Sequence, residues 1–193
     1  MTDDGRPIAE DNLPSSGIRH LSSDRQRAVV VAEARSWIGT PYHNCADIKG
    51  AGVDCGMLLV RVFVDIGLLP HFDPRPYPLD WHLHRDAERY LGFVFDFGFG
   101  EIKEPQPGDI MVLRYGRCYS HGGIISRARP LSIVHAFHPA RRVLEEETAL
   151  NAVLNDPKRK RRFFSYWANC PGASANPAGA NGLVGGVSAG GSK

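Results

Sequence analysis

A cysteine and two histidines have the residue types and the order that thiol-based catalysis requires. Cys55 lies in the stretch GVDCG (residues 52–56), at the start of an apolar run that is typical of a helix. His121 and His135 follow in segments rich in Ile and Val, which favour strands. In such a site a thiolate attacks a carbonyl carbon, an imidazole takes the thiol proton, and a third polar group orients that imidazole. These residues therefore predict a Cys–His–His nucleophilic site.

The position of Cys55 predicts an activated thiol. Asp54 is a good N-cap residue, so Cys55 should lie in the first turn of the helix. There the free backbone N–H groups and the positive end of the helix dipole favour the anion, and a neighbouring imidazolium favours it further. We therefore expect a depressed pKa at Cys55 and slower alkylation at the other three cysteines.

The alternative interpretation is structural. Cys55 would then be a small buried hydrophobe on a packed helix, and the histidines would be satisfied core or turn residues. The order of a cysteine on a helix, followed by histidines on two successive strands, favours catalysis over this alternative.

The elements that would position these residues are helices followed by strands. One helix is expected from a cap at residues 22–24 to Gly39, a second from Asp54 to Gly67, and a third over about residues 80–91. Short segments rich in Ile, Val, Phe and Tyr then predict strands at 109–115, 122–127, 131–137, 142–146 and 162–167. The fold class expected is therefore α+β, with N-terminal helices packed on an antiparallel sheet.

One folded domain between two flexible segments is the expected organisation. Residues 1–22 contain Gly, Pro and Ser with almost no apolar periodicity, and residues 171–193 consist mostly of Gly, Ala and Ser. Residues 23–170 are left for the folded domain, which is enough for a hydrophobic core.

Composition excludes several classes of function. A net charge of +2 gives no general attraction to nucleic acid or membrane, and the basic run at 158–162 lacks interleaved aromatic residues. No apolar run reaches the length of a membrane span, and the first residues lack a signal-peptide profile. Without a Cys-x-x-Cys pair, a structural zinc site is disfavoured. We therefore expect synthesis in the cytoplasm, no direct nucleic-acid partner, no membrane span, no metal and no cofactor.

Five motifs in order resemble the NlpC family of cysteine peptidases, which cut cell-wall peptides. They are WIGTPYH (37–43), GVDCG (52–56), PGDI (107–110), SHGGI (120–124) and VHA (134–136). The stretch YPLDWHLHR (77–85) is similar to the branch found in phage tails and gene transfer agents. The resemblance covers about residues 25–168.

The resemblance implies a papain-like fold in which the cysteine helix packs on the sheet that carries the histidines. By position, Cys55 matches the nucleophile, His121 the general base and His135 the polar third member. Tyr42 matches a tyrosine that lines the site and can donate to the developing oxyanion, together with the Cys55 backbone N–H. Members of the family hydrolyse the bond between D-γ-glutamyl and the diamino acid of peptidoglycan stem peptides.

The sequence departs from the family at one place. Many members have Asp-Cys-Ser-Gly at the nucleophile, where the Asp and Ser help to receive the free amine of the stem peptide. Here Asp54 matches, while Gly56 and Met57 replace the Ser and Gly. We expect Asp54 and Gly56 to border the substrate. Because Gly56 and Met57 replace the Ser and Gly, the resemblance does not determine the exact bond that is cleaved.

Two functions of different class follow. In the first, the protein is a peptidoglycan stem-peptide hydrolase carried in a phage-like tail tip, where hub or tip proteins are its partners. In the second, it is a tail-hub assembly or plug protein that keeps the papain-like domain as an interaction module without catalysis. The Cys55, His121 and His135 set favours the first. An amidase or acyltransferase on the same scaffold is a third alternative, because such a triad does not choose the acceptor.

Overall fold

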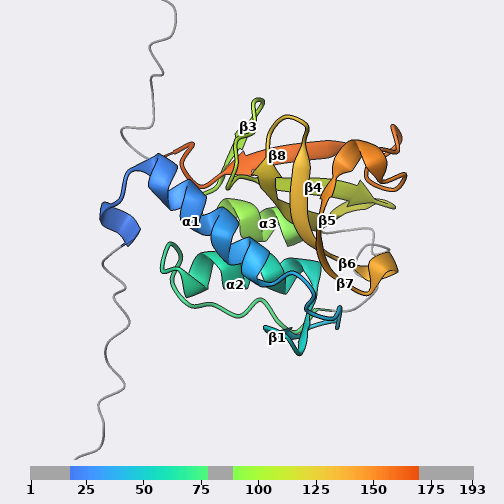
Figure 1. Ribbon diagram of the computed structural model, residues 1–193, viewed down its shortest axis with the longest axis horizontal. Coiled ribbons are helices and arrows are strands. Elements are labelled where there is room, and N and C mark those ends of the chain that lie inside the picture. The colour runs from blue at the N-terminus through green and yellow to red at the C-terminus, as the bar shows by residue number, and fades with distance from the viewer. Residues whose placement is uncertain (1–17, 78–88, 170–193) are drawn as a thin grey trace, which may run out of the picture.

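The three α-helices of the described residues lie on one face of a six-stranded antiparallel sheet (Figure 1). The computed structural model describes residues 18–77 and 89–169. Its helical elements are η1 (Ile18–His20), α1 (Ser23–Ser36), α2 (Cys55–Asp65), α3 (Arg89–Asp96), η3 (His138–Ala140) and η4 (Thr148–Leu150). Its strands are β1 (Asp47–Ile48), β2 (Gly52–Val53), β3 (Gly100–Ile102), β4 (Ile110–Tyr115), β5 (Cys118–Arg127), β6 (Ser132–Phe137), β7 (Arg142–Glu147) and β8 (Arg161–Ser165). The predicted α+β class, with helices packed on an antiparallel sheet, is confirmed.

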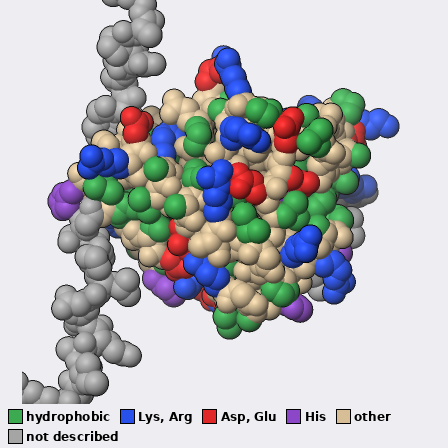
Figure 2. Space-filling view, in the orientation of Figure 1, with side chains coloured by type: hydrophobic (Ala, Val, Ile, Leu, Met, Phe, Trp, Pro, Cys, Tyr) green, Lys and Arg blue, Asp and Glu red, His purple; other side chains and the backbone are tan. Residues whose placement is uncertain are grey.

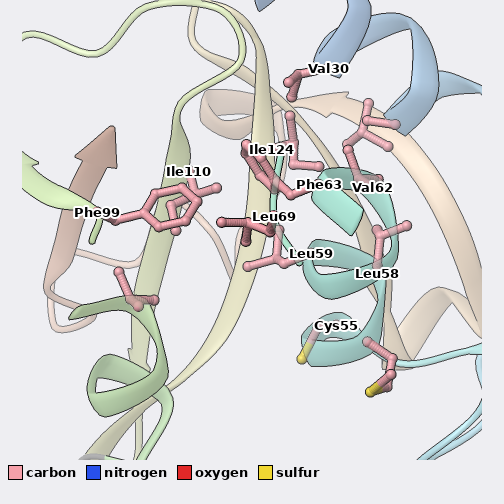
Figure 3. Close-up of a cluster of buried hydrophobic side chains, with 14 of the residues drawn as sticks. Val30, Cys55, Leu58, Leu59, Val62, Phe63, Leu69, Phe99, Ile110 and Ile124 are labelled. Carbon is pink, nitrogen blue, oxygen red and sulfur yellow. The ribbon is translucent and has the colours of Figure 1, made fainter. Parts of the chain in front are cut away.

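The central strands β4, β5 and β6 are buried on both faces of the sheet. Ile110 and Val112 of β4 point into the larger core with the three α-helices, which Figure 3 shows in close-up. Met111 and Leu113 point to the opposite face, where Leu154 covers them. Successive strand residues alternate between faces, so a strand covered on both sides is a continuous apolar run.

Helix α2 begins where the sequence predicts. Asp54 is its N-cap, and the Asp54 carboxylate accepts hydrogen bonds from the backbone N–H groups of Gly56 and Met57. The apolar side of α2, which includes Leu58 and Phe63, packs into the larger core. Capping and burial together fix Cys55 as the first residue of the helix.

Helix α1 is tied to the sheet by a buried ion pair. Nη1 of Arg27 lies 2.7 Å from Oδ1 of Asp109, whose side chain is fully buried. Nη2 of Arg27 donates to Oγ of Ser165, and the guanidinium lies 4.1 Å from the ring centroid of Trp167. Arg27 therefore joins α1 to the start of β4 and to the end of β8, which are distant from α1 in sequence.

The strand order differs from a simple meander. It is β3-β8-β4-β5-β6-β7, so β8 lies between β3 and β4. Between α1 and α2 the short strands β1 and β2 pair with each other, and neither these strands nor β3 were predicted. Short strands escape prediction because two or three residues carry too little periodicity.

The predicted boundaries are only partly covered by the structure. The folded part begins earlier than predicted, at Ile18. The Ile18 side chain is buried, and the Gln26 side chain donates a hydrogen bond to the Ile18 carbonyl. Residues 1–17 and 171–193 of the predicted flexible segments lie outside the described residues, as does Cys170 at the end of the predicted domain. Most of the third predicted helix also lies outside them, and the helix described in that region is α3.

The surface carries charge of both signs. On the face shown in Figure 2, Lys and Arg side chains lie among Asp and Glu side chains. Across the described ranges, no helix combines the length and the apolar character needed to cross a membrane.

Candidate active site

Cys55 lies beside the backbone of β5, where β5 and β6 separate. The β5–β6 ladder starts at the pair Ile124 and Val134, which leaves the first half of β5 open toward α2. The Cys55 thiol donates to the Ser120 carbonyl at 3.7 Å, and the backbone N–H of Gly122 hydrogen-bonds to the sulfur. The sulfur therefore lies against the two residues that flank His121. Figure 3 places Cys55 at one end of the larger core.

His121 and His135 are in direct contact. Nε2 of His121 lies 2.8 Å from Nδ1 of His135, and the ring centroids are 5.1 Å apart. His121 pairs with Leu113 across β4 and β5, so both side chains leave the sheet on the same face. His121 is 8% exposed and His135 is 0% exposed. The structure thus brings His121 and His135 into contact, and it places the Cys55 sulfur against the backbone on either side of His121.

The expected depressed pKa of Cys55 is wrong. Burial, together with a smaller contribution from the nearby charge of Asp54, raises the pKa of the thiol to about 12. Backbone N–H groups of Gly122, Cys55 and Gly56 lower the pKa but do not offset burial. The sequence shows the helix start and its dipole but not how deeply Cys55 is buried; the residue is only 8% exposed.

His121 is also held neutral. Burial lowers its pKa well below the usual value of 6.5, and the charges of His135 and Arg159 lower it further. The Arg159 guanidinium lies 3.9 Å from the ring centroid of Tyr115, and that ring is 5.4 Å from the ring of His121. At rest the two groups are therefore a thiol and a neutral imidazole, so any nucleophilic attack by Cys55 would require transfer of the thiol proton.

Asp54 is engaged by the protein itself. Besides capping α2, its carboxylate accepts from the Cys45 backbone N–H at 2.7 Å and from the Tyr77 hydroxyl at 2.7 and 2.9 Å. Its role toward a substrate amine stays a prediction. Gly56 is next to it: a Cβ there would meet Oδ1 of Asp54 at 3.6 Å and the Tyr77 hydroxyl at 3.7 Å, which are ordinary contacts.

Two further tyrosines border the thiol. Tyr42 is half-buried; burial raises its pKa far above 10, and the charge of Cys55 raises it too, so its hydroxyl stays a donor. Tyr90, which sequence reasoning missed, donates to the Cys55 carbonyl at 3.4 Å. The Tyr90 hydroxyl occupies the space that a Cβ at position 122 would need, so only glycine leaves room for it there. Gly56, Tyr77 and Tyr90 also line an apolar cavity between α2 and α3.

Sequence reasoning also missed the residues behind His135. Nε2 of His135 lies 2.8 Å from Oε1 of Glu146, and Nδ2 of Asn151 donates to the same oxygen at 2.8 Å. The available signal was the acidic end of a strand predicted next to the histidine strand. In the part of the chain that the structure describes, no group of three or more His, Cys, Asp or Glu side chains is placed to hold a metal ion.

Comparison with known proteins yields structural likeness only. No family model matches the sequence, and no curated protein matches it. Two structures of an N-acetylmuramoyl-L-alanine amidase from Bacteroides uniformis have TM-scores of 0.50 at 16% and 15% identity. The match covers 72% of this chain and 97% of the amidase.

A third similar structure is the NlpC/p60 domain of the peptidoglycan hydrolase SagA. Its TM-score is 0.47 at 18% identity, covering 70% of this chain and 96% of that domain. The likeness to the amidase structures establishes that this chain has their α+β fold. Function must be argued from the site itself, because one fold hosts many activities.

Proposed function

We propose that the protein is an NlpC-type cysteine peptidase that hydrolyses peptidoglycan stem peptides at the D-γ-glutamyl–diamino acid bond. The observation that carries the proposal is the thiol of Cys55 against the backbone on both sides of His121, with His121 in contact with His135. The five family motifs supply the substrate class, and the amidase likeness is compatible with a cell-wall substrate.

The chemistry follows from the arrangement of donors and acceptors. As the Cys55 sulfur attacks the γ-glutamyl carbonyl carbon, its proton passes to His121. The oxyanion accepts hydrogen bonds from the Cys55 backbone N–H and the Tyr42 hydroxyl. The C–N bond then breaks, and His121 gives its proton to the leaving amine. A water molecule deprotonated by the same imidazole hydrolyses the thioester, which restores the thiol.

The site of action belongs to the same proposal. The stretch at residues 77–85 resembles the phage-tail and gene-transfer-agent branch, and all of it after Tyr77 lies outside the described residues. We therefore place the protein in a phage-like tail tip, bound to hub or tip proteins and opening the wall locally.

Mass spectrometry of defined muropeptides tests the activity. The wild type should release products cut between D-γ-glutamyl and the diamino acid, and Cys55→Ala should release none. Cys45→Ala is the matched control, because Cys45 is a free cysteine near the site that the mechanism does not use. Products cut between the sugar and the first L-alanine would instead make the protein an amidase.

One observation favours the non-catalytic alternative. The Cys55 thiol is buried and its pKa is raised, as expected for an interaction module that no longer reacts. Absence of any cleaved muropeptide from wild-type protein, both isolated and in particles, would decide for that alternative.

A further inference from the structure

Glu146 is the side chain that faces His135 from the neighbouring strand. His135 of β6 pairs with Leu144 of β7, and Glu146 follows Leu144 by two residues on the same face. Such diagonal neighbours are within reach of long side chains. Oε1 of Glu146 lies 2.8 Å from Nε2 of His135, so the carboxylate contacts the nitrogen that points away from His121.

Asn151 holds the Glu146 carboxylate in this position. Its Nδ2 donates to Oε1 of Glu146 at 2.8 Å, while its Oδ1 accepts from the backbone N–H groups of Val153 and Leu154. Leu154 is fully buried on the face of the sheet that carries the histidines. The packing of this segment thus fixes the amide, and the amide fixes the carboxylate.

The contacts determine where the protons lie. A carboxylate only accepts, so Nε2 of His135 must carry the proton that it donates to Glu146. Nδ1 of a neutral His135 is then an acceptor, and Nε2 of His121 must donate to it. In His121 the remaining nitrogen, Nδ1, keeps its lone pair. That nitrogen is therefore the acceptor that the proposed mechanism requires for the Cys55 proton.

We propose that Glu146 is a positioning residue that sets the proton positions of both histidines and thereby makes Nδ1 of His121 the base. The proposal rests on the proposed function only for its effect on turnover. During attack the thiol proton moves to Nδ1 of His121, and the new positive charge is shared with Nδ1 of His135 through the existing hydrogen bond. No proton moves to Glu146, whose charge orients His135 and strengthens it as an acceptor.

Nitrogen-15 NMR of histidine-labelled protein tests the proton positions directly. The wild type should show both His121 and His135 protonated on Nε2 and not on Nδ1. A proton on Nδ1 of His135, whether alone or with one on Nε2, overturns the proposal. This spectrum needs neither a variant nor a substrate, so it stands even if the protein cleaves no muropeptide.

Variants then test whether Glu146 is the cause. In Glu146→Met, His135 loses its acceptor and should move its proton to Nδ1, which shifts the proton of His121 from Nε2 to Nδ1. If the near-ultraviolet circular dichroism spectrum shows that Glu146→Met is not natively folded, Glu146→Ala is used as the test variant in its place. Glu146→Gln keeps an oxygen that can accept from Nε2 of His135, so both histidines should stay protonated on Nε2 as in the wild type. Unchanged spectra in the Met or Ala variant overturn the role of Glu146.

Kinetics separates positioning from binding. Glu146→Met should lower kcat by about 10²–10⁴-fold with KM little changed, because the wrong tautomer impairs the base. Glu146→Gln should recover most of that loss. Glu145→Gln is the matched control: Glu145 pairs with Arg35 at the surface and should leave kcat unchanged. Equal losses in the Gln and Met variants overturn the proposal.

Discussion

Nε2 of His121 lies 2.8 Å from Nδ1 of His135 inside the protein. Both rings are buried, so each nitrogen in this contact has a definite role as donor or acceptor. The proposed mechanism gives the two histidines unequal roles, because His121 lies between the residues that contact the thiol and His135 is one ring further away.

Substitution of the two histidines should separate these duties. His121→Ala removes the base and should lower kcat by about 10⁴-fold. His135→Ala removes only the orienting ring and should cost about 10²-fold, while His135→Gln keeps an acceptor and a donor and should recover part of the rate. Muropeptide turnover by each variant is the measurement. Equal rates for the Ala and Gln variants at position 135 would contradict an orienting role.

The thiol should react as a buried one. Because burial raises the pKa of Cys55 to about 12 from 9.0, its alkylation by iodoacetamide should keep accelerating with pH above 9.0. Peptide mass spectrometry after timed alkylation at several pH values gives the profile for each cysteine. A Cys55 rate that reaches its plateau below about pH 8.5 would show an activated resting thiolate instead.

Acid should destabilise the fold through His121. Its pKa is below 6.5 in the folded protein and near 6.5 when unfolded, so below pH 6.5 the unfolded chain binds a proton that the folded protein does not. The free energy of unfolding should therefore fall as pH drops, by at most about 1.4 kcal/mol per pH unit for one proton. His121→Gln should flatten this slope in denaturant titrations. His20→Gln, at an exposed histidine, is the control. If both substitutions flattened the pH slope equally, burial of His121 would not be the cause of the acid destabilisation.

Gly122→Ala should displace Tyr90. The added Cβ would lie 2.9 Å from Cζ of Tyr90 and 3.0 Å from Cδ1 of Leu59, closer than packed side chains tolerate. We expect a loss of about 1–3 kcal/mol in the free energy of unfolding, most of it relieved in the double variant with Tyr90→Ala. Gly92→Ala in α3 has open space and should be neutral or stabilising. Strict additivity of the Gly122 and Tyr90 changes would exclude the clash.

The buried ion pair of α1 should contribute more than a surface pair. Arg27→Ala leaves Asp109 buried without its cation and should cost about 3–5 kcal/mol in chemical denaturation. Arg35→Ala breaks the exposed pair with Glu145 and should cost under about 1 kcal/mol. Similar losses at the two arginines would mean that burial of the pair is unimportant.

Local features of the site were predictable from the sequence. Asp54 caps α2 and Cys55 begins it because capping depends on residues two and three positions away. Strands were also predicted at 122–127 and 131–137, where the apolar runs are long enough, and the second contains His135. His121 precedes the first predicted range by one residue, because β5 begins earlier, at Cys118. The contact between the two histidines follows once these strands pair.

Features that depend on tertiary packing were not predictable. The raised pKa of Cys55 depends on how deeply the sulfur is buried, and no local pattern encodes that depth. Glu146 reaches His135 only in one register of β6 and β7. Tyr90 of α3 reaches Gly122 of β5, which is distant in sequence. The place of β8 between β3 and β4 is likewise a choice among sheet orders that the sequence pattern leaves equal.

The position of β8 has a consequence for synthesis on the ribosome. Strands β4 to β7 pair with neighbours that are adjacent in the chain, so each hairpin can form as it emerges. β3 pairs with β8, as in Gly100 with Ser165, and must wait for a late segment of the nascent chain. High contact order of this kind slows folding. A nascent chain that ends before Arg161 already carries Cys55 and both histidines, yet lacks the strand that completes the sheet. Completion of the sheet is thereby coupled to translation of its last strand.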